Sequence, residues 1–357
     1  MPSALIAGMG IQGVAIYHGM HVLGYDVSGV DISEENLSSA KGTLTSLGTP
    51  VNLTNSNILD STLIEDTVPD VLVCALPFHL NYPIAEKCIR NGIRYCDLGG
   101  NIDTSDKIRA LAEKSATVPV TTDLGLAPGI ANNFAEVGYH KIDNADTVKI
   151  RVGGLPANPK GTLKYGMTFN PQGLYNEYRE DCIVFRDGKK LTIESLSDIE
   201  DIEFDGMPPL VAFNTSGGIA NLLDSMMERG VRNCDYKTIR FPGHVELIRF
   251  MLFECGMDLD CFSRAIENSC GFITDDQVLI SIEVLNSETS EKWSLKSIVM
   301  HDETFTAMQK TTGFGAACVA AVLGSGAMDH KKYAEYIDVP IDDFIANIRK
   351  LLPGIDI

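Results

Sequence analysis

The chain has 357 residues, 45% of them hydrophobic and 22% charged, which is ordinary for a globular protein with a large buried core. Its formal net charge of −19 argues against a nucleic acid or an anionic membrane as a partner, because both attract basic surfaces. No apolar stretch approaches the roughly 20 residues needed to span a bilayer, and the sequence starts directly on a predicted strand. We therefore expect neither a signal peptide nor a membrane anchor.

The nine cysteines are scattered along the chain, and no two of them form a Cys-x-x-Cys motif. An odd number of separated cysteines is typical of free thiols in a reducing compartment. No cluster of histidine, cysteine or acidic residues has the spacing of a metal site. We therefore expect a cytoplasmic protein without a bound metal ion.

The first residues of the chain form a glycine-rich motif that suits a dinucleotide. A predicted strand over residues 4–7 is followed by three glycines at G-x-G-x-x-G spacing and by a predicted helix over residues 11–23. The first glycine permits the tight turn, the second lets a pyrophosphate approach the backbone, and the third lets the helix pack closely on the strand. The helix N-terminus then faces the anion. The residues assigned to this part of the cofactor site are Gly8, Gly10, Ile11, Gln12 and Gly13.

Asp31 ends the second predicted strand, over residues 25–30, and lies eighteen residues beyond Gly13. This distance fits the acidic residue that binds the adenosine ribose hydroxyls in dinucleotide-binding folds. Neither Ile32 nor Ser33 could neutralise a 2′-phosphate, and the carboxylate would repel one, so the sequence favours NAD over NADP. The alternative is that Asp31 is only a polar strand end.

Strands and helices alternate over the next hundred residues. The further predicted strands are 51–53, 71–76, 95–98 and 118–122, and the predicted helices are 33–46, 82–91 and 105–115. This order predicts an α/β fold with a doubly wound parallel sheet, whose strands all end at the edge where ligands bind. The residues that we expect to line the dinucleotide groove at that edge are Ala75, Leu76, Pro77, Gly99, Gly100 and Asn101.

The pattern changes after residue 131, because predicted strands then follow one another with turns between them. The strands expected here are 148–152, 182–185, 190–193, 210–213, 277–285 and 292–300, and the helices are 218–229, 245–255 and 259–268. Asp187-Gly188 predicts a tight hairpin, and the acidic stretch 194–205 is interpreted as a solvated hairpin flank. We expect an α+β domain with a largely antiparallel sheet.

The last two predicted helices, 311–323 and 341–352, show the apolar spacing of helices that pack on a core. We expect the chain to return here to its first domain. The predicted organisation is a dinucleotide-binding domain over residues 1–130, completed by residues 308–357, and a substrate domain over residues 131–307.

Asp123 follows a predicted strand at the point where the chain passes from the first domain to the second. A carboxylate there could act as a general base or bind an ammonium group. Pro128-Gly129 should end the loop and open the next helix. The alternative is that Asp123 only caps that helix, and the spacing does not decide between the two.

Basic groups beside glycines are conspicuous in so acidic a chain. Arg151 precedes two glycines, and Lys237, Arg240 and His244 lie within eight residues of one another. The planar guanidinium of arginine suits a substrate carboxylate. Lys237 and Arg240 are three residues apart on a predicted strand, so their side chains should point to opposite faces. The alternative for His244, which we favour slightly, is a helix N-terminal residue without a catalytic role. The turn 215–218 is polar, opens a predicted helix, and is another candidate carboxylate site.

Nine stretches of the sequence resemble the saccharopine dehydrogenase family, and most of all its short lysine 6-dehydrogenase branch. They run in family order over nearly the whole chain, and PGIAN, YKTIRFPGH and QKTTGF are the more specific among them. The stretches are GMGIQG (8–13), ALP (75–77), DLGGN (97–101), DLGLAPGIANN (123–133), RVGGLP (151–156), FNPQGLYNEY (169–178), FNTSGG (213–218), YKTIRFPGH (236–244) and MQKTTGFGAACVA (308–320). Carboxynorspermidine and homospermidine enzymes share the architecture, but these stretches resemble them less.

The resemblance implies an NAD(P)-dependent oxidoreductase that acts on a C–N bond of an amino acid. In the lysine 6-dehydrogenase branch, the side-chain amine of L-lysine is oxidised with NAD, water releases ammonia, and the 6-semialdehyde cyclises to piperideine-6-carboxylate. Saccharopine dehydrogenases act instead on the secondary amine that joins lysine to glutamate, and this activity is the alternative. A third hypothesis, from another class, is a non-catalytic NAD-binding redox sensor that kept the fold.

On this interpretation Asp123 is the candidate base, with Lys237 or His244 assisting. The residues assigned to substrate binding are Arg151, Tyr165, Thr215 and Arg240. Lysine presents one carboxylate and saccharopine three, so the modest number of basic groups favours the smaller substrate. Dehydrogenases of this build are often homodimers, and we expect a homodimer here.

Overall fold

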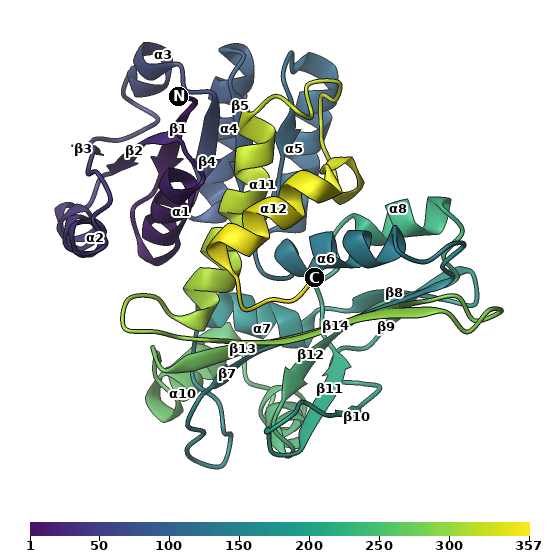
Figure 1. Cartoon of the computed structure of the whole chain (residues 1–357). Helices are drawn as coiled ribbons and strands as arrows, with labels where there is room; N and C mark the ends of the chain where they lie inside the picture. The colour runs from purple at the N-terminus through teal and green to yellow at the C-terminus, as the bar shows by residue number, and fades with distance from the viewer. The chain divides into compact units, whose positions relative to one another are not determined.

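The computed structural model describes residues 1–357, and the chain divides into two compact units (Figure 1). Unit 1 comprises Met1–Asn133, Gln309–Ile355 and Ile357, and unit 2 comprises Phe134–Met308 and Asp356. None of the helices is both long enough and apolar enough to cross a bilayer. All nine cysteines are unpaired.

Unit 1 contains a six-stranded sheet in which every neighbouring pair of strands is parallel. The strand order is β3-β2-β1-β4-β5-β6, which is the order of dinucleotide-binding α/β folds. The strands are β1 (Ser3–Ala7), β2 (Asp26–Asp31), β3 (Leu53–Asn55), β4 (Val71–Cys74), β5 (Arg94–Asp97) and β6 (Val120–Thr121). The predicted α/β class with a doubly wound parallel sheet is confirmed.

Two groups of helices accompany this sheet. They are α1 (Ile11–Val22), α2 (Glu34–Ser46), α3 (Leu63–Thr67), η1 (Phe78–Leu80), α4 (Asn81–Arg90) and α5 (Ile102–Ser115) from the first part of the chain, and η3 (Gln309–Phe314), α11 (Gly315–Gly324), η4 (Tyr336–Asp338) and α12 (Ile341–Leu351) from its end. Helix α6 (Ile130–Tyr139) contains the point where the chain passes into unit 2. Helix α1 contacts η3, α11 and α12, so the C-terminal helices pack within unit 1.

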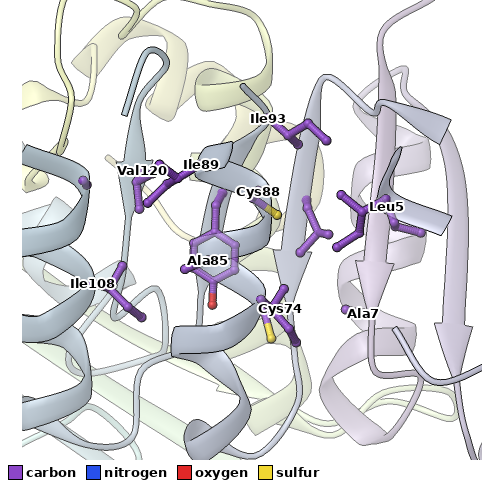
Figure 2. Packing of buried hydrophobic residues seen from close by; sticks show 14 of the residues in the cluster. Leu5, Ala7, Cys74, Ala85, Cys88, Ile89, Ile93, Ile108 and Val120 are labelled. Carbon is purple, nitrogen blue, oxygen red and sulfur yellow. The ribbon is translucent and has the colours of Figure 1, made fainter. Parts of the chain in front are cut away.

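Alternate residues of the strands separate the two faces of this sheet. Leu5 of β1 and Leu72 of β4 pack with Ile84 of α4 and Ile108 of α5 in one buried cluster, part of which Figure 2 shows. The alternate residues of each strand point to the opposite face of the sheet, and α11 contacts β4 and β5. Strands that are buried on both faces explain the continuous apolar run at 71–74.

Gly13 offers a direct test of how closely α1 packs on the turn. A Cβ at this position would lie 1.8 Å from the carbonyl oxygen of Gly8. We expect Gly13→Ala to lower the free energy of unfolding by about 1–3 kcal/mol, as overpacking does, in urea unfolding experiments. Gly42 of α2 is the matched control, because a Cβ there meets no atom within 4 Å. Gly42→Ala should instead raise stability by about 0.5–1 kcal/mol, the usual helix preference for alanine, and equal effects at both sites would contradict the close packing.

Unit 2 is built on a mixed, largely antiparallel sheet in the order β10-β11-β12-β7-β13-β14, with β8 pairing to β12 and β9. Only the central pair of β12 and β7 is parallel. The strands are β7 (Thr147–Pro156), β8 (Cys182–Arg186), β9 (Lys189–Ile193), β10 (Glu200–Ile202), β11 (Leu210–Asn214), β12 (Asn233–Arg240), β13 (Asp276–Leu285) and β14 (Lys292–Met300). The predicted hairpin between β8 and β9 is confirmed, with positive φ at both Asp187 and Gly188.

The helices of unit 2 are α7 (Pro171–Arg179), α8 (Leu222–Glu228), α9 (His244–Arg249), η2 (Phe250–Glu254) and α10 (Leu259–Ser269). Helix α7 is not among the helices predicted from the sequence, although the side chain of Asn170 caps it by accepting a hydrogen bond from the N–H of Gly173, and Pro171 opens it. The predicted helix 245–255 is divided, because α9 continues as the π-helix η2.

Candidate functional site

The glycine-rich turn of unit 1 leaves room for an anion at the N-terminus of α1. Gly8 has a φ of +94°, and its N–H donates to the carbonyl oxygen of Val30 at 2.8 Å. A Cβ on Gly10 would meet no atom within 4 Å, in contrast to Gly13. No side chain caps α1 at Gly10, so the first N–H groups of the helix are available to a bound anion.

Two further residues of the predicted cofactor site lie in the first turn of α1. The side chain of Ile11 is largely exposed, which is unusual for an isoleucine at the start of a buried helix. The side-chain oxygen of Gln12 is buried and has no hydrogen-bond partner. A buried acceptor without a donor is costly, and a ligand that donates a hydrogen bond would satisfy it.

Asp31 ends β2, as predicted, but it already accepts three hydrogen bonds. Its carboxylate accepts from the N–H groups of Met9 at 2.7 Å and Ser33 at 2.8 Å, and from the amide of Asn36 at 3.1 Å. Asp31 is only 6% exposed. A carboxylate has about four acceptor positions, so about one remains for a ribose hydroxyl. Asp31 therefore also fixes the glycine-rich turn to β2, a role that its distance from Gly13 does not predict.

The loops after β4 and β5 lie at the same edge of the sheet as the glycine-rich turn, because these strands run parallel to β1. The N–H of Ala75 donates to the carbonyl oxygen of Ala7 at 2.8 Å, which holds the loop after β4 next to the turn. Asn101 caps α5 by accepting the N–H of Thr104 at 3.0 Å. The predicted cofactor residues in these loops are Ala75, Leu76, Pro77, Gly99, Gly100 and Asn101, and their contact with a cofactor stays a prediction.

Asp123 follows β6 in a strained and tightly held conformation. Its φ is +64°, in the left-handed region that non-glycine residues rarely adopt and that recurs at functional sites. Its carboxylate lies 3.0 Å from the hydroxyl of Ser105 and accepts from Thr122 at 2.8 Å. A Cβ on Gly99 would lie 2.2 Å from the same carboxylate, so residue 99 must be glycine for Asp123 to fit. The side chain does not cap α6, which begins only at Ile130.

Asp97 lies next to Asp123 in the same buried region of unit 1. It accepts hydrogen bonds from the N–H groups of Gly99 at 2.8 Å and Asp123 at 3.3 Å, and from the hydroxyl of Tyr95 at 2.9 Å. Burial, and then the charge of Asp123, raise the pKa of Asp97 to about 7, and burial raises the pKa of Asp123. Two neighbouring carboxylates of this kind favour holding one proton near neutral pH, which suits proton transfer.

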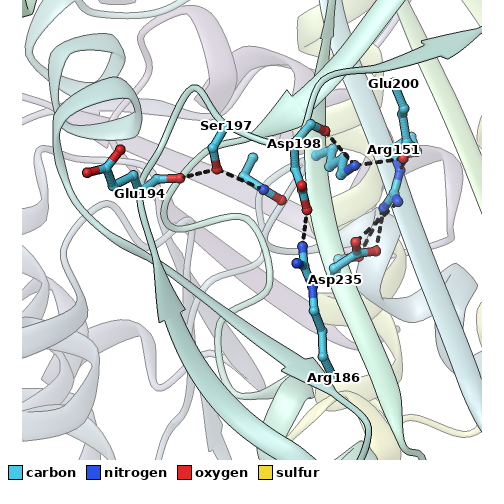
Figure 3. Close-up of polar contacts among 9 residues, drawn as sticks. Arg151, Arg186, Glu194, Ser197, Asp198, Glu200 and Asp235 are labelled. Carbon is cyan, nitrogen blue, oxygen red and sulfur yellow. Dashed lines mark hydrogen bonds and ion pairs between the residues drawn. The ribbon is translucent and has the colours of Figure 1, made fainter.

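In unit 2, three buried lysine and arginine side chains lie on the adjacent strands β7 and β12. Two of them share Glu200: Nε of Arg151 lies 2.5 Å from one of its carboxylate oxygens, and Nζ of Lys237 lies 2.6 Å from the other. Figure 3 shows Arg151 between Glu200 and Asp235, to which it is also paired at 2.6 Å. Both cations therefore have carboxylate partners within unit 2.

This arrangement does not support a substrate-binding role for Arg151 or a catalytic role for Lys237. The acidic stretch that we interpret from sequence as a solvated flank supplies their counter-charge, because Glu200 begins β10. Burial alone would raise the pKa of Glu200, but Arg151 and Lys237 hold it below its usual value. The glycines that follow Arg151 also lie inside β7 rather than after it, and a Cβ on Gly153 would lie 2.6 Å from the carbonyl oxygen of Ile239.

Arg240 is the third buried cation, and it forms no ion pair with a carboxylate. Lys237 and Arg240 use opposite faces of β12, as their spacing predicts. Arg240 is 3% exposed; its Nε donates to the hydroxyl of Tyr178 at 3.0 Å and its Nη1 to the carbonyl oxygen of Ile239 at 2.9 Å. Nη2 makes no hydrogen bond. A buried charge without a partner is costly, so this guanidinium is the group of unit 2 best placed to receive an anion.

His244 orients Arg240 through Tyr178 and has no free ring nitrogen. Its Nδ1 lies 3.2 Å from the carbonyl oxygen of Leu163, so Nδ1 carries the proton. Nε2 must then accept the hydroxyl hydrogen of Tyr178, at 3.0 Å, and this hydroxyl accepts from Arg240. Burial, and then the charge of Arg240, lower the pKa of His244 to about 3. This environment does not support the predicted catalytic role, and His244 is better described as a positioning residue.

Tyr165 and Thr215 lie in the same region as Arg240. Cζ of Arg240 lies 5.1 Å from the centre of the Tyr165 ring, and the Tyr165 hydroxyl is buried without a hydrogen-bond partner. The hydroxyl of Thr215 lies 2.7 Å from that of Thr238, on the same face of β12 as Arg240. An unpartnered hydroxyl beside a guanidinium that forms no ion pair with a carboxylate indicates a site for a polar ligand.

The turn over residues 215–218 does not open a helix, contrary to the prediction. Helix α8 begins at Leu222, and Ala220 has a φ of +45°, which is incompatible with a helix over these residues. A Cβ on Gly218 would lie 2.4 Å from the ring of Tyr236. Gly218 is therefore required for packing, and the turn offers no helix N-terminus to a carboxylate.

Sequence reasoning missed two neighbouring residues of this region, Glu177 and Tyr178. Both lie on α7, which was not predicted as a helix. The Asn170-Pro171 pair, followed by Leu174 and Tyr178 four residues apart, was the available signal for a helix with one buried side. Asp97 was also missed as a partner of Asp123, although it ends the buried strand β5 and Asp123 follows the neighbouring strand β6.

Comparison with known proteins gives one family and one close fold. The model of the saccharopine dehydrogenase C-terminal domain matches residues 125–350. The apo structure of histidine-tagged saccharopine dehydrogenase (L-Glu forming) from Saccharomyces cerevisiae superposes with a TM-score of 0.72 over 99% of this chain and 98% of its own, at 14% sequence identity. At this identity the likeness establishes the fold.

Two other solved structures are much less similar. A probable dehydrogenase from Thermotoga maritima has a TM-score of 0.47 at 12% identity, covering 98% of this chain and 94% of its own. An oxidoreductase from Agrobacterium radiobacter, in complex with NAD+, L-tartaric acid and magnesium, has a TM-score of 0.46 at 8% identity, with coverage of 98% and 94%. The family match spans well over half of the 357 residues, and the chain therefore belongs to the family defined by the saccharopine dehydrogenase C-terminal domain.

Proposed function

We propose that the protein is an NAD-dependent oxidoreductase that oxidises the side-chain amine of an amino acid. The substrate that we propose is L-lysine, and the product is its 6-semialdehyde or the cyclic piperideine-6-carboxylate. The fold shared with saccharopine dehydrogenase supports the class of enzyme. The observation that carries the choice of an amino acid is Arg240, a buried guanidinium without a carboxylate partner.

The residues at the sheet edge of unit 1 fit NAD. The open space beside Gly10 and the uncapped N-terminus of α1 suit a pyrophosphate, and the remaining acceptor position of Asp31 suits a ribose hydroxyl. The unpartnered oxygen of Gln12 could accept a further hydrogen bond. When bound, NAD supplies the acceptor for the hydride that leaves the carbon next to the amine.

Proton transfer in this proposal falls to Asp123, assisted by Asp97. Oxidation of an amine to an imine removes a hydride from carbon and a proton from nitrogen; water then adds to the imine and ammonia leaves. A base is needed for the proton on nitrogen and for that of the attacking water. Burial raises the pKa of Asp123, and the neighbouring Asp97 has a pKa raised to about 7, so this pair of carboxylates can take up and return a proton near neutral pH.

The ion pairs of unit 2 favour lysine over saccharopine. Saccharopine carries three carboxylates, and Arg151 and Lys237 would be the other buried cations able to bind them. Both are already paired with Glu200. Arg240 alone can bind one carboxylate, as lysine requires.

The proposal is tested by measuring NADH formation with L-lysine and with saccharopine, each with NAD and with NADP. We expect turnover with lysine and NAD. Turnover of saccharopine without turnover of lysine would instead identify a saccharopine dehydrogenase. A protein that binds NAD but oxidises neither compound, nor another ω-amino acid, would support the non-catalytic redox sensor.

A further inference from the structure

Glu177 is a half-buried carboxylate that has no hydrogen-bond or ion-pair partner for its side chain. It directly precedes Tyr178 on α7, and its charge acts on Arg240, Tyr165 and Tyr236. Yet Glu177 and Arg240 do not form an ion pair. Opposite charges in one buried region normally pair, because each is costly alone, so their separation needs an explanation.

The geometry of Arg240 explains why the two charges stay apart. Its Nε is held by Tyr178, which His244 fixes in turn, and its Nη1 is held by the carbonyl oxygen of Ile239. The guanidinium therefore cannot turn freely towards Glu177. Nη2 of Arg240, which makes no hydrogen bond, and the unpartnered hydroxyl of Tyr165 remain available to a negatively charged group of a ligand.

We propose that Arg240 and Glu177 together bind the α-amino-acid end of the substrate, Arg240 through the α-carboxylate and Glu177 through the α-ammonium group. A zwitterion that carries both charges on one carbon pairs with both residues and leaves neither unpaired. Tyr165 can add a hydrogen bond to the carboxylate. The inference rests on the proposed function and makes it more specific, because the amine that reacts must then be the one at the far end of the side chain.

The inference excludes two kinds of compound that resemble lysine. A diamine lacks the carboxylate for Arg240, and an ω-amino acid without an α-amino group leaves Glu177 unpaired. Discrimination of this kind is strong, because a binding site built for a charged group is left with a buried, unpartnered charge when that group is missing.

The test compares L-norleucine with hexanoate, which differ only in the α-amino group, by isothermal titration calorimetry on the full chain at pH 8. We expect the wild type to bind norleucine about tenfold more tightly than hexanoate, or more, as a charge-assisted hydrogen bond allows. Glu177→Gln should bring this ratio close to one while hexanoate affinity changes little, and Glu177→Asp should restore part of it. The matched control is Glu180→Gln, because Glu180 is exposed at the C-terminal end of α7 and its carboxylate accepts a hydrogen bond from the hydroxyl of Ser216 at 3.4 Å.

A pH series on the wild type tests the same inference without any substitution. Burial raises the pKa of Glu177 to about 7, against the opposing charge of Arg240. The preference for norleucine should therefore shrink as the pH falls from 8 to 6 and Glu177 is protonated. The other titratable groups of the cluster stay in one state over this range: the pKa of His244 is lowered to about 3, and burial raises the pKa values of Tyr165, Tyr178 and Tyr236.

The outcomes separate this inference from the proposed function. A wild type that does not prefer norleucine, or a Glu177→Gln variant that keeps the preference, overturns the inference even if lysine is oxidised. If the preference holds but no amino acid yields NADH, the proposed function fails and the binding role of Glu177 stands.

Discussion

Replacing Arg240 with methionine is expected to lower kcat/KM for L-lysine by about 30-fold to 4,000-fold. The reason is that loss of a buried, charged hydrogen-bonding partner costs about 2–5 kcal/mol of binding, and about 1.4 kcal/mol corresponds to a factor of ten. Most of the loss should appear in KM, because the α-carboxylate is held equally before and during the reaction. Steady-state kinetics with NADH absorbance measure both constants.

The same substitution should lower stability less than the removal of an ion-paired arginine does, which distinguishes a binding role from a structural one. Arg240 forms no ion pair with a carboxylate, so its removal breaks two hydrogen bonds but no ion pair. Arg151→Met is the matched comparison, since it removes a buried arginine that pairs with Glu200 and Asp235. That variant should lose about 2–4 kcal/mol in urea unfolding, towards the lower range for a broken buried pair because Glu200 is partly exposed. The binding role would be contradicted if Arg240→Met lost as much stability as Arg151→Met and if its folded fraction oxidised lysine with wild-type kcat and KM.

Asp123→Asn is expected to lower kcat by about 100-fold to 10,000-fold, the usual contribution of a general base, with NAD affinity close to that of the wild type. In the wild type, kcat/KM should fall as the pH falls through the raised pKa of Asp123, because the base must be ionised to accept a proton. The variant should lose this acidic limb of the pH profile. Asp106→Asn is a suitable control, because Asp106 is exposed on α5 and changes the same charge nearby. An unchanged kcat in Asp123→Asn would exclude it as the base.

The parallel sheet of unit 1 was predictable because each of its signals is local. The glycine spacing, the distance to Asp31 and the apolar run at 71–74 are set by the geometry of single turns and strands. Helix α7 was missed although one of its signals is local. The capping signal at Asn170-Pro171 lies within two residues. Only Leu174 and Tyr178 of the nine residues of α7 are fully buried, so the helical spacing of apolar residues is weak.

The chemistry of unit 2 was harder to predict because it depends on pairing between distant residues. Nothing in the sequence near Arg151 shows that Glu200, 49 residues later, neutralises it. Strand geometry alone predicts that Lys237 and Arg240 lie on opposite faces of β12. Which of the two cations lacks an ion pair depends on the position of β10, because Glu200 of β10 pairs with Lys237. His244 likewise resembles a catalytic residue until the carbonyl of Leu163 and the hydroxyl of Tyr178 occupy both of its nitrogens.

The hydrogen bonds that join Leu163, His244, Tyr178 and Arg240 all point in one direction, and this has a consequence for how the enzyme responds to acidity. Arg240 donates to Tyr178, Tyr178 donates to His244, and His244 donates to Leu163. Because its pKa is lowered to about 3, the imidazole stays neutral down to about that pH. A histidine at the heart of a binding site usually makes affinity sensitive to pH between 5 and 8. Here it does the opposite, because the imidazole stays neutral throughout that range and adds no charge beside Arg240, the residue that we propose binds the carboxylate. Carboxylate recognition should therefore stay constant in conditions where the cell's acidity changes, and sensitivity near neutrality is left to the ammonium side of the substrate.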